Sequence, residues 1–208
     1  MNDLVTLSRR AFLAGTSAFL AGCAVHQVSY QPIPRETASR WSVADVRVLV
    51  PDDLVVDQSN VMLPSADIVW YGAKPDDRRA HVAQIVKAGV AEGVKGLRGD
   101  TRVVLDIQLI RFHALTPTAY FKAPQGTGVH GIGFLATVRD AKTGAVLHGP
   151  ERIEADMPAR TLADEPNQDA GTYTGREEAA IRGQIGAVIR GWLGLGPDIR
   201  GSFSRMGK

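Results

Sequence analysis

The residues of this chain that are able to do chemistry are few, and the first of them is its only cysteine, Cys23. A thiolate is a nucleophile and a metal ligand, but a zinc-type site needs several ligands that converge at close spacing. The histidines stand alone, with no H-x-H or H-x-x-x-H pair: His26, His81, His113, His130 and His148. We therefore predict no metal site and no cofactor.

Cys23 is better explained by the segment that precedes it. The run Leu20-Ala21-Gly22-Cys23 follows a basic N-terminus and an apolar stretch over residues 11–20. Such a stretch is too short to span a bilayer, and it has the charge and length of a signal peptide. The run resembles a bacterial lipobox, in which a signal peptidase cuts before the cysteine and the cysteine is acylated. The resemblance implies a signal peptide over residues 1–22 and a lipid anchor at Cys23.

The basic part of this leader resembles a twin-arginine export signal, on the strength of Arg9, Arg10, Phe12 and Leu13. That signal routes proteins to a dedicated translocon, whereas an ordinary secretory leader with two arginines is the alternative. Two or more acyl chains hold a protein stably on a membrane. The residue after the cysteine is not aspartate, which favours the outer over the inner membrane. We expect a lipoprotein that faces the periplasm.

Composition narrows the remaining possibilities. The formal net charge of the 208 residues is +2, and the sequence has no block of basic residues. It therefore lacks the basic patch that is typical of nucleic-acid-binding proteins. No later stretch is apolar enough to span a membrane. Residues 23–40 contain two prolines and few apolar side chains, and we predict a lipidated tether there. A single domain is expected over residues 41–193, followed by a flexible tail over 194–208.

Periodicity predicts the elements of this domain. Alternating apolar and polar residues indicate strands, and apolar residues three or four positions apart indicate helices. The fold class expected from the order of these elements is α+β, with an antiparallel sheet of about four strands and two helices packed on one face. The predicted strands are 46–50, 66–71, 101–115, 130–138 and 145–154, and the predicted helices are 78–99 and 176–193.

Motifs for catalysis are absent from the sequence. The glycines at 126, 128 and 131 match G-x-G-x-x-G, but a strand follows them where a nucleotide site needs a helix. There is no G-x-S-x-G sequence, and we predict no catalytic residue. The loop 115–125 carries Tyr120 and Phe121, which could contact a partner or acyl chains. The alternative is that this loop folds back over the edge of the sheet.

The lipobox, the tether and the order of elements from the helix 78–99 to the last helix together resemble small envelope lipoproteins of lipid transport. These are the auxiliary lipoproteins of ABC-type and MCE-type transporters and the lipoprotein of the lipopolysaccharide-assembly translocon. The order is also similar to that of uncharacterised alphaproteobacterial lipoproteins. The resemblance covers residues 41–193 in element order only, and it implies a non-enzymatic fold with an envelope protein partner.

Three hypotheses for function follow. The first is an accessory lipoprotein of a transport or outer-membrane assembly system, which needs a filled core. The second is a carrier of lipid or another small ligand, which predicts a cavity lined by Val103, Leu105, Phe134 and Ile185. The third is a hydrolase, which needs a polar cluster around a serine or histidine at the mouth of a loop.

Overall fold

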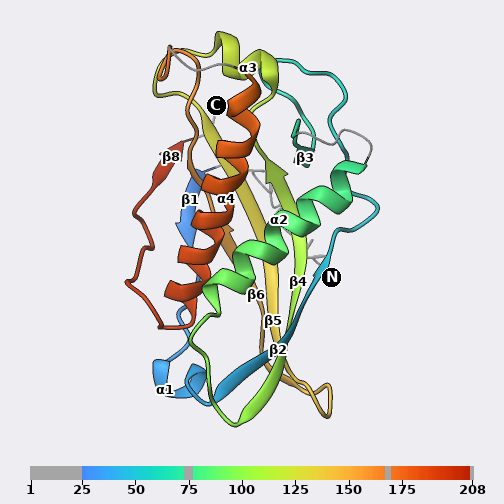
Figure 1. The fold of residues 1–208 in the computed structure, drawn as a ribbon, viewed down its shortest axis with the longest axis vertical. Coiled ribbons are helices and arrows are strands. Elements are labelled where there is room, and N and C mark those ends of the chain that lie inside the picture. The colour runs from blue at the N-terminus through green and yellow to red at the C-terminus, as the bar shows by residue number, and fades with distance from the viewer. Residues whose placement is uncertain (1–24, 73–76, 167–169, 207–208) are drawn as a thin grey trace, which may run out of the picture.

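The protein forms one mixed β-sheet with helices packed on it (Figure 1). The computed structural model describes residues 25–72, 77–166 and 170–206. These residues contain the strands β1 (Val25–Ser29), β2 (Trp41–Leu49), β3 (Ile68–Val69), β4 (Thr101–His113), β5 (Val129–Asp140), β6 (Val146–Ala155), β7 (Met157–Pro158) and β8 (Ser204–Met206). The helices are α1 (Arg35–Ala38), α2 (Arg78–Gly93), α3 (Pro117–Lys122) and α4 (Ala170–Trp192).

The predicted fold class is wrong in the number and the direction of the strands. The sheet has eight strands, in the order β2-β4-β5-β6-β1-β8, with β3 beside β4 and β7 beside β5. The strands β2 and β3 run parallel to β4, whereas the pairs from β4 to β8 are antiparallel. Parallel pairing follows from the connection through α2, because two parallel strands need a long crossover between them. The alternation of apolar and polar residues along a strand does not indicate whether the neighbouring strand is parallel or antiparallel, so the sequence pattern could not predict the parallel pairs.

The two long helices cover the same face of the sheet, and the core fills the space between (Figure 1). The predicted helix 78–99 ends earlier, at Gly93. Glycine in α2 lets the two helices approach closely. A Cβ atom added at Gly93 would lie 2.6 Å from Cβ of Ile189 in α4, and one at Gly89 would lie 2.8 Å from Cβ of Ile185. Gly89 therefore serves the contact between helices.

Residues 25–40 and 194–206, which were expected to belong to a tether and a tail, are part of the folded domain. The strand β1 pairs with β6 and with β8. Tyr30 and Ile33 are buried in the same core as the helices. The Tyr30 hydroxyl donates a hydrogen bond to Oδ1 of Asp198 at 3.0 Å and accepts one from the backbone N–H of Ile199 at 3.0 Å. The two ends of the described chain are therefore fixed to each other, where a flexible tether over 23–40 and a tail over 194–208 were predicted.

A bulge in β4 changes the pattern of the strand near its end. The register against β5 shifts between Leu109 and Arg111. As a result, Leu109 and Phe112 are both buried in the core although they are three residues apart. The shift places Arg111 among the acidic side chains of β6 and of the residue after it. A strict alternation over 101–115 would have placed Arg111 in the core.

Candidate functional site

Two hollows lie at the end of the molecule where Figure 1 labels α3. The larger, which we call the groove, has a volume of about 750 Å³. Its walls come from residues 62–65, from residues 113–116 at the end of β4, from α3, and from the loop 123–129, with His26 and Arg205 at its side. The smaller, which we call the charged pocket, has a volume of about 230 Å³ and lies between α3, β7 and α4.

Hydrogen bonds fix the wall of the groove that has no regular secondary structure. The Thr116 hydroxyl donates to the carbonyl oxygen of Val61 at 2.8 Å and accepts from the Ala119 N–H at 3.0 Å. Thr116 is thus the N-cap of α3. Its hydroxyl is the acceptor for a backbone N–H group at the start of the helix, which has no partner within the helix. Nε2 of His113 lies 3.3 Å from the carbonyl oxygen of Pro64. The side chains of His113 and Thr116 thus hold residues 61–64 in place.

The loop 115–125, predicted to carry a contact surface, contains the helix α3. Its two aromatic side chains have different environments. Tyr120 is only 1% exposed and lines the charged pocket, whereas Phe121 is 49% exposed. The rings lie 5.2 Å apart in an edge-to-face contact. Phe121 is therefore the ring of this pair that is open to a partner, and the Tyr120 ring is the one that is buried.

The groove has an apolar lining with a basic group at its side. No aspartate or glutamate is among its lining residues in the described part of the chain. Nη1 of Arg205 donates to the carbonyl oxygen of Gly128 at 3.2 Å, and the guanidinium carbon lies 5.6 Å from the centre of the Phe203 ring. Burial lowers the pKa of His113, which therefore stays uncharged at neutral pH. Arg205 is the permanent charge of the groove.

An ion network beneath the groove ties β1 to the rest of the sheet. Asp156 is fully buried and lies 3.0 Å from Nδ1 of His26 and 3.1 Å from Nη2 of Arg111. It also accepts hydrogen bonds from the backbone N–H groups of Ile132 at 2.7 Å and Gln27 at 3.1 Å. These contacts join three strands and the residue after β6. The network positions His26 at the side of the groove.

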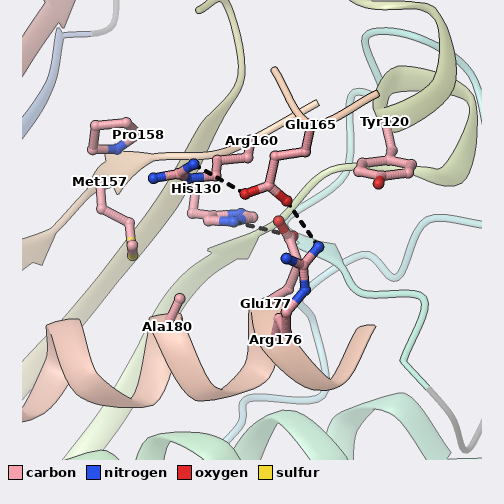
Figure 2. A pocket seen from close by; sticks show the side chains of 9 residues that line it. All are labelled: Tyr120, His130, Met157, Pro158, Arg160, Glu165, Arg176, Glu177 and Ala180. Carbon is pink, nitrogen blue, oxygen red and sulfur yellow. Dashed lines mark hydrogen bonds and ion pairs between the residues drawn. The ribbon is translucent and has the colours of Figure 1, made fainter. Parts of the chain in front are cut away.

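The charged pocket contains acids and bases in pairs, as Figure 2 shows. Nε2 of His130 lies 3.0 Å from Oε2 of Glu177, with side chains that are 2% and 8% exposed. Glu165 contacts Arg160 at 3.0 Å and Arg176 at 2.8 Å. The lining contains two glutamates and two arginines, so the numbers of acidic side chains and of guanidinium groups are equal. The pair of Arg176 and Glu165 joins α4 to the loop after β7.

The positions predicted to line a carrier cavity are packed instead. Val103, Leu105, Phe134 and Ile185 are at most 1% exposed and belong to one continuous core between sheet and helices. The sequence did not reveal the groove, because its walls come from segments far apart in the chain. The nearest signal was the loop 115–125, which contributes α3 and part of the lining.

The residues predicted for export and lipidation lie outside the described residues. They are Arg9, Arg10, Phe12, Leu13, Leu20, Ala21, Gly22 and Cys23. Among the described residues, no group of three histidine, cysteine or acidic side chains could hold a metal ion. No helix in the described part of the chain has the length and apolar character to cross a bilayer.

Comparisons with solved structures find distant similarities. PelC from Paraburkholderia phytofirmans, solved as a dodecamer, is 13% identical, with a TM-score of 0.33, over 80% of this chain and 98% of that chain. A candidate lipoprotein from Caulobacter crescentus CB15 is also 13% identical, with a TM-score of 0.28, over 78% of this chain and 97% of that chain. At these values neither structure indicates what this chain does.

Comparison with curated protein sequences finds no match. A family model does match, over residues 41–208, which is most of the chain. The matched region begins at β2 and includes both long helices, the groove walls and Arg205. The chain belongs to the family described as a family of unknown function, DUF6778.

Proposed function

We propose that this protein is a non-catalytic lipoprotein of the cell envelope that serves as an accessory subunit of a transport or outer-membrane assembly system. The observation that carries the proposal is the short sequence distance between the groove and the predicted acylation site. His26 belongs to β1 (Val25–Ser29) and lines the groove. Cys23, the predicted acylation site, is two residues before Val25.

This spacing links the anchor to the groove. Each residue adds at most about 3.6 Å to an extended chain, so the Cα atoms of Cys23 and Val25 are separated by no more than about 7 Å. An acyl chain on Cys23 would then hold the groove near the lipid head groups, with no long tether between them. Exposed apolar side chains occur nearby, at Met62 and Leu63. Such a surface suits a partner or ligand at the membrane.

The chemistry of the two hollows favours binding over catalysis. In the charged pocket, His130 is paired with Glu177, and no serine or cysteine lines it within the described residues. In the groove, Ser65 and His113 are both present, but His113 is engaged with the Pro64 carbonyl. A nucleophile and its base need to be within hydrogen-bond reach of each other. No hydrogen bond joins Ser65 to a histidine within the described residues, and we therefore place the enzyme hypothesis last.

A second candidate function is a carrier of lipid or another small ligand, and the groove favours it. Its volume of about 750 Å³ is in the range of roughly 300–1,000 Å³ that is typical of small-molecule sites. In this hypothesis the ligand lies in the groove and not between the sheet and the helices, because that space is filled by the core.

The test compares the native chain with Cys23→Ser in cells. We expect the native protein to carry an acyl mass increment on Cys23 and to fractionate with membranes, and we expect the variant to lose both. Photo-crosslinking from position 121 in the native protein, where Phe121 is 49% exposed and does not line the groove, should then give one protein adduct, a component of a transport or assembly system. The matched control is position 49, where Leu49 is also exposed but belongs to β2.

Two results would contradict the proposal. Membrane fractionation that persists in Cys23→Ser, together with a native protein of unmodified mass, would exclude the lipid anchor. Lipid adducts at position 63 without a protein adduct at position 121 would exclude the accessory role and favour the carrier.

A further inference from the structure

We infer that the groove binds one acyl chain of an anionic lipid, with Arg205 beside the head group. The inference deepens the carrier alternative above and relies on the proposed membrane anchor only for the supply of lipid. It is carried by the lining of the groove and by the position of its one permanent charge.

The first argument is the apolar character of the walls. Most lining side chains are aliphatic or small, and the larger aliphatic ones are Met62, Leu63, Leu115 and Val129. Leu63 is 81% exposed, so a ligand that covered it would remove apolar area from water. An acyl chain in the groove would cover this side chain and would itself leave water. The favourable free energy of binding is roughly proportional to the apolar area that the acyl chain and the groove remove from water.

The second argument is that the threonine hydroxyls of the walls are already engaged. The Thr116 hydroxyl is used by Val61 and Ala119, and the Thr127 hydroxyl donates to the carbonyl oxygen of Pro124 at 2.6 Å. A peptide segment would bring its own backbone N–H and C=O groups, which need partners when buried. An acyl chain needs none. The walls therefore favour an acyl chain over a peptide.

The third argument is charge. The groove contains a guanidinium and no carboxylate, and Arg205 has no ion-pair partner among the described residues. By contrast, Arg200, five residues earlier, forms an ion pair with Asp198 at 2.6 Å. An arginine at the side of an apolar groove matches a carboxylate or phosphate, to which guanidinium donates two parallel hydrogen bonds. The lining thus fits a lipid with one negative head group.

The test uses the native protein in phosphatidylethanolamine vesicles that contain a photoactivatable palmitate, with adducts mapped by mass spectrometry. We expect saturable labelling of residues 62–65 and 123–129, and competition by unlabelled palmitate. Arg205→Gln should weaken palmitate binding about tenfold, because a hydrogen bond to a charged group contributes about that much. It should leave labelling by the uncharged hexadecanol analogue unchanged. Arg200→Gln is the matched control and should match the native protein with both probes.

Leu63→Asp provides a second variant that does not depend on Arg205. Leu63 is exposed, so the variant should fold, and it should lose labelling by both probes. Labelling that is spread over the surface, or that is equal in the native protein and both groove variants, would overturn the inference. So would protein adducts that replace lipid adducts at position 63.

Failure of the lipid anchor is recognised separately, from the intact mass of the same sample. A protein without acyl groups can still be labelled by the probe in solution, and that experiment tests the groove on its own.

Discussion

The groove and the charged pocket lie on two sides of α3, and neighbouring residues of the chain line different hollows. Ala119 lines the groove and Tyr120 the pocket, and likewise Val129 lines the groove and His130 the pocket. Yet their chemistry is opposite. The pocket is small and its charges are paired with each other, whereas the groove is large, mostly apolar and has one arginine without an acidic partner. Pairing of charges therefore separates a site that holds the fold together from one that can bind.

The pocket and the groove should respond differently to substitution. Removing a charge from water is costly, and a buried pair is stable only while both partners are present. The pocket should therefore respond to substitution with a loss of stability. The groove exposes apolar side chains and a half-buried arginine, so substitution there should change binding more than stability.

The largest effect should come from breaking the buried pair in the pocket. We expect Glu177→Ala to lower the free energy of unfolding by about 3 kcal/mol, because His130 loses its buried partner. The measurement is urea unfolding followed by circular dichroism. Glu178→Ala is the control on the same helix, since the Glu178 side chain is 36% exposed where it meets His81. It should cost less than about 1 kcal/mol. Equal losses for both variants would contradict the structural role of the pocket.

The next effect concerns the helix contact that holds α4, and with it Glu177, in place. A methyl group at Gly93 would lie 2.6 Å from Cβ of Ile189 and 2.8 Å from the carbonyl oxygen of Gly186. Gly93→Ala should therefore lower the free energy of unfolding by about 2 kcal/mol through overpacking. Gly183 in α4 has open space around it, so Gly183→Ala should raise stability by about 0.5–1 kcal/mol. Thermal unfolding of both variants measures the difference, and a stabilised Gly93→Ala would be inconsistent with the close approach.

The sequence predicted the long elements because their patterns are local. The helix beginning at residue 78 and the strands β4, β5 and β6 are near their predicted places, since apolar spacing depends only on neighbouring residues. The segment 25–40 was missed for the opposite reason. Tyr30 is buried by contact with Asp198 and Ile199, which are about 170 residues away in the chain. Prolines and polar residues nearby gave it the composition of a tether.

The candidate site was predictable only in part, for a related reason. The loop with Tyr120 and Phe121 contributes residues to both hollows, but it contains a helix, and Tyr120 lines the charged pocket and not the groove. Arg205 had no local signal, because it becomes part of the groove through the pairing of β8 with β1. Pairing between chain ends is not encoded in either end alone.

A smaller effect is expected from pH. Burial lowers the pKa of His113, and the charges of Arg111 and His26 add to this, whereas the Pro64 carbonyl and Asp57 oppose it. The unfolded chain takes up a proton at about pH 6.5 and the folded chain only at lower pH. His113 therefore favours folding above that pH, and this contribution is lost as the pH falls below it. The free energy of unfolding should decrease less between pH 7 and pH 5 in His113→Gln than in the native protein.

The smallest change in stability should occur at the edge of the groove, where the side chains are most exposed. Leu63 is 81% exposed and Leu49 is 58% exposed, so aspartate at either position removes little buried area. Both variants should unfold within about 0.5 kcal/mol of the native protein in urea. Only Leu63→Asp should lose acyl-chain labelling, because only Leu63 lines the groove. A large loss of stability in Leu63→Asp would instead make the groove wall part of the structural core, and the distinction between the two hollows would no longer hold.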